Sequence, residues 1–292
     1  MNNCFNKIGL IGKYGNPQVA ETVRELGMLL QKRGCEIMIE HTTNQLLTIQ
    51  DLPCASLDEI GRNADLTIIV GGDGTLLAAA RTLVEYDIPI LGVNLGRLGF
   101  LVDISPNDME ERVNEILDGE YEEEHRILLN AQVQHRGSPP SESDAFNDVV
   151  IHKWEVARMI ETETWVNGRF LNSMRSDGLI VSTPTGSTAY ALSGGGPIIE
   201  PGVNAILIVP ICPHSMSYRP IVVGGDSEIE ILVKENMHSH AQVTCDGQIN
   251  LGLVSGDKIL IRKKDKVIRL IHPHQHNHFE ILRAKMHWGE HS

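Results

Sequence analysis

The stretch of residues 66–75 restricts the possible folds more than any other part of the sequence. It reads Leu-Thr-Ile-Ile-Val and then Gly-Gly-Asp-Gly-Thr, after which an apolar, periodic run begins at Leu76. The first five residues are typical of a buried strand, and the later run predicts a helix over 76–85. A strand, a glycine-rich turn and a helix N-terminus form the place where an α/β sheet presents backbone N–H groups to a phosphate. Asp73 adds a carboxylate to this turn, which favours chemistry or metal binding there.

Strands and helices alternate over the first 120 or so residues. The hydrophobic pattern predicts strands at 8–11, 36–40, 66–70 and 88–93, and helices at 17–33, 57–63, 76–85 and 106–117. Strands separated by helices pair in parallel. We therefore expect a doubly wound, Rossmann-like α/β domain over residues 1–124, which carries the Gly-Gly-Asp-Gly-Thr turn.

The pattern changes after the acidic run at 120–124, because strands then follow strands. A hairpin is expected at Asn167-Gly168, and a short helix is expected near 187–192. These features predict a mostly-β domain over 125–270 and a tail over 271–292 that packs back on the first domain. The expected strands are 127–134, 146–152, 156–166, 170–174, 179–182, 205–209, 221–223, 229–233, 241–244, 258–262 and 267–271.

Composition excludes several classes of partner. The net charge is -13 and no dense Lys/Arg stripe occurs, so nucleic acid is not expected as a partner. No apolar run approaches the roughly 18 residues that span a membrane, and the N-terminus has no secretory h-region. The five cysteines are odd in number and widely spaced. This usage indicates a reducing, cytoplasmic environment.

Neither common phosphate cradle fits the turn at 71–75. The Walker sequence is absent, and the dinucleotide fingerprint would need glycine where the chain has Leu77. A plain tight turn is the alternative for any Gly-Gly pair. Asp73 between glycines, with Thr75 at a cap position, argues against that alternative.

A second loop is rich in hydroxyl groups. Residues 182–193 read Ser-Thr-Pro-Thr-Gly-Ser-Thr-Ala-Tyr-Ala-Leu-Ser, and Gly-Gly-Gly-Pro follows. A helix that starts near Ser187 would point N–H groups at an anion, and Tyr190 offers a ring on which a base can stack. The alternative is a Ser/Thr-rich helix cap with an ordinary packed tyrosine. The density of hydrogen-bonding groups favours a nucleotide site.

These two segments together resemble the NAD kinase family. The Gly-Gly-Asp-Gly-Thr turn also occurs in diacylglycerol, sphingosine and 6-phosphofructokinase-like kinases. The segment 177–190, Asp-Gly-Leu-Ile-Val-Ser-Thr-Pro-Thr-Gly-Ser-Thr-Ala-Tyr, is much more specific to NAD kinases. The resemblance covers essentially the whole chain and is strongest to bacterial members.

The resemblance implies transfer of the γ-phosphoryl group of ATP to the 2′-hydroxyl of the adenosine ribose of NAD, which gives NADP. Asp73 would be the catalytic base. Asp148 stands where the family has Glu, and Arg175 stands where many relatives have a small residue, which bears on the choice between NAD and NADH. The implied substrate- and nucleotide-binding residues are Gly72, Asp73, Gly74, Thr75, Phe100, Asn147, Asp148, Arg158, Arg175, Asp177, Thr185, Thr188, Ala189, Tyr190, Ala191, Leu192, Ser193 and Gln248.

Phosphoryl transfer needs positioning and neutralisation of charge. In an acidic chain without a P-loop lysine, Mg²⁺ or another divalent cation is expected as cofactor, with ATP as donor. Asp73 could take the proton or bind this metal. The expected partners are NAD, ATP and further copies of the chain, as a homodimer or homotetramer. The alternative functions are a lipid or sugar kinase of the same superfamily and a non-catalytic NAD(P)-binding sensor.

Histidines occupy alternate positions at 272, 274, 276 and 278. On a strand they would share one face, where imidazoles can take Zn²⁺ or Ni²⁺. Because no cysteine or carboxylate completes a site nearby, apart from Glu280, we expect a solvated segment without a physiological metal.

Overall fold

The computed structural model describes residues 3–13, 17–47, 53–96, 98–135, 137–154, 159–234, 241–253, 256–274 and 276–289. The chain forms two compact units. The first unit comprises Met1–His125 and Ile268–Ser292, and the second unit comprises Arg126–Val267. The chain therefore leaves the first unit once and returns to it near its end.

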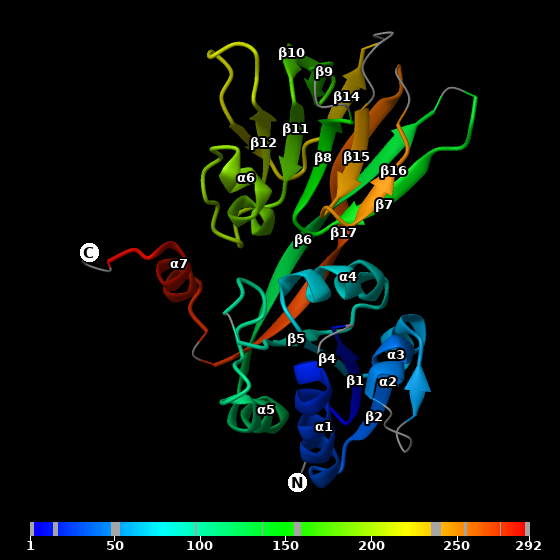
Figure 1. Ribbon diagram of the computed structural model, residues 1–292, viewed down its shortest axis with the longest axis vertical. Helices are drawn as coiled ribbons and strands as arrows, with labels where there is room; N and C mark the ends of the chain where they lie inside the picture. Colours follow the sequence, from blue (N-terminus) through cyan, green and yellow to red (C-terminus); the bar gives the residue numbers. More distant parts are fainter. Residues whose placement is uncertain are drawn as a thin grey trace. The chain divides into compact units, whose positions relative to one another are not determined.

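A parallel sheet forms the centre of the first unit, with strand order β5-β4-β1-β2-β3 and the last residues of β17 beside β5. Its strands and helices alternate along the chain (Figure 1). The alternation confirms the predicted α/β class. The elements are β1 (Lys7–Gly12), α1 (Pro17–Lys32), β2 (Glu36–Glu40), α2 (His41–Leu47), β3 (Cys54–Ala55), α3 (Leu57–Asn63), β4 (Leu66–Val70), α4 (Asp73–Leu83), η1 (Val84–Tyr86), β5 (Ile90–Val93), α5 (Met109–Asp118) and α7 (His278–Met286).

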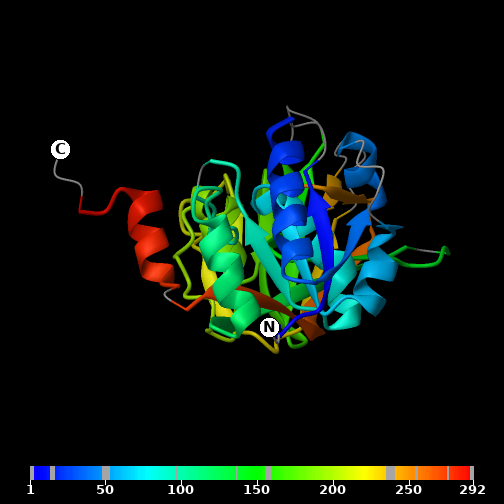
Figure 2. The same cartoon turned by 90° about the horizontal axis from the view of Figure 1, so that it is seen from below.

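Helices α1 and α5 lie side by side on one face of this sheet (Figure 2). Their apolar stripes are spaced so that they bury together against strand residues, as amphipathic helices do. The buried stripe of α1 consists of Val19, Val23, Leu26 and Leu30, and that of α5 of Met109, Val113, Ile116 and Leu117. All five residues of β4 are buried, as expected for a strand covered on both faces.

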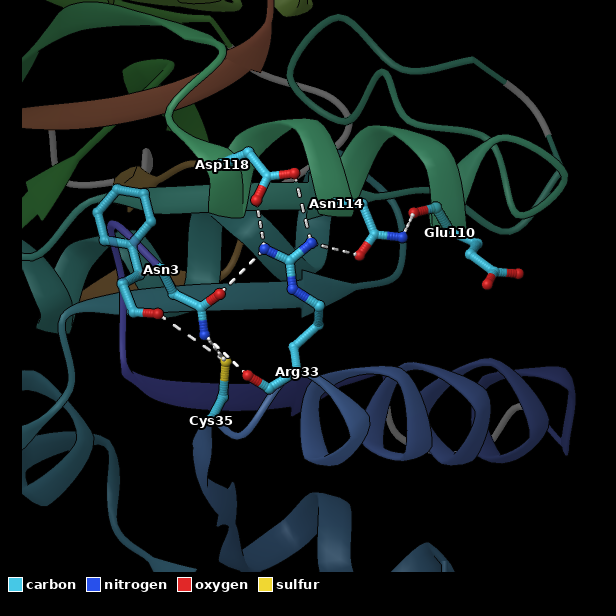
Figure 3. A network of polar contacts seen from close by, with 7 residues as sticks. Asn3, Arg33, Cys35, Glu110, Asn114 and Asp118 are labelled. Carbon is cyan, nitrogen blue, oxygen red and sulfur yellow. Dashed lines mark hydrogen bonds and ion pairs between the residues drawn. The ribbon is translucent and has the colours of Figure 1, made fainter. Parts of the chain in front are cut away.

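Arg33 links these two helices through polar contacts (Figure 3). Its guanidinium donates to the side chain of Asn114 at 3.0 Å and to the carboxylate of Asp118, both on α5. It also donates to the side-chain oxygen of Asn3 at 3.0 Å, and Asn3 returns a bond to the carbonyl of Arg33. The Arg33 side chain is only 10% exposed, so these bonds form largely away from water.

The second unit is built almost entirely of strands, which confirms the predicted mostly-β class. A six-stranded antiparallel sheet has the order β13-β12-β11-β8-β15-β16, and a second group of strands runs β10-β9-β14-β17. Their inner faces share one apolar core. The elements are β6 (Tyr121–Gln134), β7 (Ser141–Ala145), β8 (Asp148–Lys153), β9 (Ile160–Val166), β10 (Arg169–Ser176), β11 (Gly178–Ser182), η2 (Thr185–Thr188), α6 (Tyr190–Ser193), β12 (Ala205–Ile211), β13 (Ile221–Gly224), β14 (Ile229–Val233), β15 (Ala241–Cys245), β16 (Ile249–Leu251) and β17 (Lys258–Pro273).

Several predicted boundaries were wrong. The helix after the glycine-rich turn starts at Asp73 rather than Leu76, because the turn residues themselves adopt the first helical turn. The two strands expected at 258–262 and 267–271 are one strand, β17. The polar residues between them are tolerated because they lie at partly exposed positions. The hairpin at Asn167-Gly168 is confirmed, with φ values of 52° and 71°.

Candidate active site

Asp73 is the first residue of α4, and Gly72 precedes it as the N-cap. The carboxylate of Asp73 accepts two backbone hydrogen bonds from the loop that follows β5. Its Oδ2 accepts the N–H of Phe100 at 2.9 Å, and its Oδ1 accepts the N–H of Leu101 at 3.1 Å. These bonds fix the half-buried carboxylate at the N-terminus of the helix while leaving it partly accessible.

Gly99 makes this arrangement possible, although the sequence reasoning did not select it. A Cβ atom at position 99 would lie 2.1 Å from Oδ1 of Asp73. Any larger residue would therefore displace the carboxylate or the loop. The available signal was the pair of glycines at 96 and 99, which breaks the segment after β5.

The turn before α4 exposes backbone. Gly72 and Gly74 are exposed, and a Cβ at Gly72 would enter open space. The N–H of Thr75 bonds to the carbonyl of Gly72 at 2.9 Å, so the turn is closed by its own backbone. The N-terminus of this eleven-residue helix carries a partial positive charge that favours an anion. Phe100 lies in the same unit, and Nζ of Lys285 is 5.7 Å from the centre of its ring.

A cavity of about 360 Å³ opens in the second unit. It lies where the start of β8 meets the ends of its two neighbours, since Asp148 pairs with Ser182 of β11 and Val149 pairs with Cys245 of β15. Four predicted site residues line it together. The lining consists of Asn147, Asp148, Val150, His152, Ala189, Tyr190, Thr244, Asp246 and Gly247.

Asp246 organises this cavity and was not predicted. Its Oδ1 accepts the N–H groups of Asn147 at 2.7 Å and Asp148 at 3.2 Å, and its Oδ2 accepts that of Phe146 at 3.0 Å. Asp246 and Gly247 have φ values of 53° and 62°, as in the tight turns that favour Asp-Gly. The Asp-Gly pair between two short strands was the signal that could have found it.

The hydroxyl-rich loop at 182–193 uses several hydroxyl groups to hold its own shape. Ser182 and Thr183 both donate to backbone carbonyls of the 146–147 segment. Ser187 is fully buried, and its hydroxyl donates to Pro184 while accepting the N–H of Ile199. The expected helix near Ser187 is instead a 3₁₀ turn followed by the four-residue α6. The loop is thereby fixed against the segment that carries Asn147 and Asp148.

Gly186 allows this close approach. A Cβ atom there would lie 2.1 Å from the carbonyl oxygen of Asn147. Thr185 is also buried, and its hydroxyl accepts a bond at 3.1 Å from the buried Arg126. The Thr-Gly-Ser sequence therefore serves packing of the loop as well as any ligand.

The carboxylate of Asp148 faces the cavity and is 5% exposed as a residue. Burial, and then the charge of Asp246, raise its pKa to about 7. No residue in the described ranges donates a hydrogen bond to this carboxylate. It is therefore an acceptor that a ligand hydroxyl can use.

The remaining predicted residues of the second unit do not line this cavity. Arg175 is exposed on β10, and Asp177 pairs with Lys153 at 2.6 Å. Ala191 is fully buried in a small apolar cluster, and Gln248 is exposed. Thr185, Thr188, Leu192 and Ser193 belong to the loop just described. Arg158 lies outside the described residues.

The prediction of a solvated histidine tail was wrong for His272. This residue is 1% exposed near the end of β17, and its Nδ1 lies 3.0 Å from Oδ2 of Asp103. The strand ends at Pro273, so the alternate histidines do not share one strand face. His274 is exposed, whereas His276 returns to Asp103. The partner carboxylate was invisible in the sequence because it lies 169 residues away.

A carboxylate fixed at a helix N-terminus and a polar cavity with an aromatic ring are features of a nucleotide-dependent phosphotransferase. Two family models match the chain. That of the ATP-NAD kinase N-terminal domain matches residues 8–121, and that of the ATP-NAD kinase C-terminal domain matches residues 146–273. The chain belongs to the NAD kinase family.

Individual relatives agree with this assignment. The NAD kinases of Pseudomonas entomophila (strain L48) and Azotobacter vinelandii (strain DJ) are each 48% identical over 285 residues, which covers 98% of this chain and 96% and 97% of the relatives. An NAD kinase from Archaeoglobus fulgidus, solved in complex with ATP, has a TM-score of 0.76 at 26% identity and covers 96% of this chain and 98% of that chain. Yeast NADH kinase complexed with NADH has a TM-score of 0.88 at 24% identity, over 98% of this chain and 89% of that chain, and supports the fold.

Within the described ranges, no helix has the length and apolar character needed to cross a membrane. The five cysteines all lie in described ranges, and none of them forms a disulfide.

Proposed function

We propose that this chain transfers the γ-phosphoryl group of ATP to the 2′-hydroxyl of the adenosine ribose of NAD. The observation that carries the proposal is the carboxylate of Asp73, which two backbone N–H groups fix at an exposed helix N-terminus. Membership of the NAD kinase family supports the choice of substrates. The products are NADP and ADP.

Asp73 acts as general base in this proposal. Its carboxylate accepts the proton of the 2′-hydroxyl as the ribose oxygen forms a bond to the γ-phosphorus. The bond between the γ-phosphorus and the β,γ-bridging oxygen breaks, and ADP leaves with that oxygen. General-base catalysis of this kind contributes roughly 10²–10⁴-fold. Gly72, Gly74 and Thr75 lie against the phosphates at the positively polarised N-terminus of α4.

The cavity of the second unit binds the adenosine half of NAD. The half-exposed ring of Tyr190 stacks on the adenine, and Asn147 and Asp148 bind ribose hydroxyls. Asp148 suits this role because its carboxylate receives no bond from a described residue. It is one methylene shorter than the Glu of the family, and it lines the cavity.

Other assignments remain part of the proposal. Asp177 meets the nicotinamide half, Arg175 lies near the transferred phosphate, and Gln248 and Phe100 contact the nucleotide. Mg²⁺, when bound with ATP, neutralises phosphate charge, and the carboxylate of Asp73 is a ligand type that fits such an ion. The enzyme acts in the cytoplasm as a homo-oligomer, in keeping with five cysteines that form no disulfide and with the exposed edge strand β13.

Asp73→Asn tests the catalytic assignment. The amide keeps the size of the side chain but cannot take the proton. We expect NAD to bind with nearly unchanged affinity by calorimetry, while NADP formation with ATP and Mg²⁺ falls by at least about 100-fold. Asp87→Asn, an exposed position of the same unit, is the control and should keep full activity. Retained activity in Asp73→Asn would rule out the base role.

A substrate screen tests the reaction itself. NAD, NADH, a diacylglycerol and a sugar alcohol are each incubated with ATP and Mg²⁺, and ADP release is measured. Phosphorylation of the lipid or sugar alone would make the chain another kinase of this superfamily. Binding of NAD without turnover of any substrate would make it a sensor.

A further inference from the structure

Three side chains of the first unit converge outside the proposed active site. Asp103 lies in the segment between β5 and α5, His272 lies near the end of β17, and His276 lies just before α7. Oδ2 of Asp103 is 3.0 Å from Nδ1 of His272 and 2.7 Å from Nδ1 of His276. The two imidazole rings stack with their centres 3.8 Å apart. We call these three residues the His-Asp cluster.

The cluster is buried, yet much of its hydrogen-bonding capacity is unused. The side chains of Asp103, His272 and His276 are 10%, 1% and 9% exposed. Oδ1 of Asp103 and Nε2 of His276 are buried and have no hydrogen-bond partner within the described ranges, and Nε2 of His272 has only the carboxylate of Glu124 at 3.4 Å. Buried polar atoms without partners are costly, so a cluster that serves only to hold segments together would be expected to satisfy them.

The three side chains lie close enough together to bind one metal ion after small side-chain movements. One ligand atom from each member lies within 4.8 Å of the other two. Ligand atoms about 2.0–2.2 Å from a tetrahedral Zn²⁺ are separated by roughly 3.3 Å. Nδ1 of His272 and Nδ1 of His276 both contact Oδ2 of Asp103. If that oxygen moves away from them, the lone pairs of the two nitrogen atoms meet at one point, where a metal ion can bind.

From this juxtaposition we propose that the His-Asp cluster binds one divalent transition-metal ion of the Zn²⁺ type. Nδ1 of His272, Nδ1 of His276 and the carboxylate of Asp103 are the ligands, and water fills the open position. Two imidazoles and one carboxylate suit Zn²⁺, whereas Mg²⁺ and Ca²⁺ prefer oxygen ligands alone. The site is therefore distinct in chemistry from the Mg²⁺ that accompanies ATP.

Glu124 supplies a hydrogen-bond acceptor for the ring nitrogen of His272 that does not bind the metal. Its Oε2 lies 3.4 Å from Nε2 of His272. When Nδ1 of a histidine binds a metal, the proton of the neutral ring resides on Nε2 and is donated to a neighbouring carboxylate or carbonyl. Glu124 is placed to accept the Nε2 proton of His272 when Nδ1 of that ring binds the metal.

The ion has a route to the site. A cavity of about 380 Å³ is lined by Asp103 and His276, together with the acidic Asp108 and Glu280 and the basic Arg112, which is paired with Glu115. Acidic side chains at this opening favour the entry of a cation. His274, by contrast, has a side chain that is 76% exposed and lies outside the cluster.

Metal binding at this site would join three segments of the first unit. Asp103 is two residues beyond Leu101, whose N–H binds the carboxylate of Asp73. Lys285 of α7 lies over the ring of Phe100 in the same segment. The ion would hold this segment against the end of β17 and the start of α7.

Zinc binding by the full-length protein tests the proposal. The protein is treated with EDTA, exchanged into metal-free buffer, and dialysed against Zn²⁺ at micromolar concentrations, and bound metal is counted by mass spectrometry. We expect one ion per chain in the native protein. His276→Gln should weaken binding by about tenfold or more, and Glu124→Gln should weaken it by about tenfold. His274→Gln is the matched control from the same histidine tail and should bind as the native protein does.

Two further measurements keep the result interpretable. Circular dichroism melting in EDTA should give the same transition for His276→Gln and His274→Gln, which shows that lost binding is not lost folding. X-ray absorption of the Zn²⁺ form should report two imidazoles and oxygen ligands. Absence of binding at 100 µM, a concentration on the order of ten times a weak site's Kd, would overturn the proposal. Equal loss in His274→Gln and His276→Gln would also overturn it, because it would indicate chelation by the tail alone.

Discussion

Asp148 and Asp246 place two carboxylates on the wall of one cavity, 98 residues apart in the sequence. Asp246 is occupied by three backbone N–H groups, whereas the carboxylate of Asp148 is left for a ligand. Burial and the charge of Asp246 together raise the pKa of Asp148 to about 7. This relationship makes both binding and stability depend on pH near neutrality.

The affinity for NAD should rise with pH through about 7. Only the ionised form of Asp148 accepts hydrogen bonds from two ribose hydroxyls, and ionisation increases as pH passes the raised pKa. The Kd of NAD should fall about tenfold between pH 6 and pH 8 in the native protein. Calorimetric titrations should show this dependence, and Asp148→Asn should remove it. Asp226→Asn, at an exposed position of the second unit, is the control and should keep it.

Asp148→Asn should also stabilise the fold most above neutral pH. The carboxyl has a higher pKa in the folded state than the roughly 3.9 of the unfolded state, so the folded state holds its proton more tightly. The resulting loss of folding stability in the native protein is absent below about pH 4, grows as pH rises, and is constant above about pH 7. Urea unfolding should therefore show the stability of the variant, relative to the native protein, rising by roughly 2–3 kcal/mol between pH 5 and pH 8. If the difference in free energy of unfolding between the variant and the native protein decreases as pH rises, the raised pKa of Asp148 is contradicted.

Gly99→Ala should reduce turnover more than NAD binding. The added methyl would lie 2.1 Å from Oδ1 of Asp73, so the carboxylate or the segment at 99–101 must move. Misplacement of a catalytic group by about 1 Å can reduce the rate on the order of 100-fold. Steady-state kinetics should show a lower kcat while the Kd of NAD changes little. Gly252→Ala, where the methyl meets nothing within 4 Å, controls for the general effect of replacing a glycine and should keep the native kcat.

Arg33→Met should destabilise the first unit. Methionine retains an aliphatic chain but removes the donors to Asn3, Asn114 and Asp118 (Figure 3). We expect the free energy of unfolding to fall by about 1–2 kcal/mol, since Asp118 is half-exposed and regains water. Arg112→Met, which breaks a partly exposed ion pair within α5, should change it by less than about 0.5 kcal/mol. Equal losses in the two variants would show that Arg33 acts only through its charge.

Much of the architecture could be predicted because it depends on local periodicity. The buried strand β4, the glycine-rich turn and the change from alternating strands and helices to successive strands all leave patterns within short windows. α7 was missed because its sequence mixes histidine, charged and apolar residues without a clear stripe. Its Asn277 cap, which accepts the N–H groups of Phe279 and Glu280, was the signal that remained.

The sequence by itself determined the two motifs, the α/β and mostly-β classes, and the family. Only the tertiary structure decided which distant groups meet: Asp246 with the segment at 146–148, Gly99 with Asp73, and Asp103 with His272 and His276. The physical reason is that periodicity reports which side of an element is buried, a property of neighbouring residues. The partner of a buried polar group depends instead on strand order and register, as where β8 lies between β11 and β15. Those pairings are set by the packing of the whole unit.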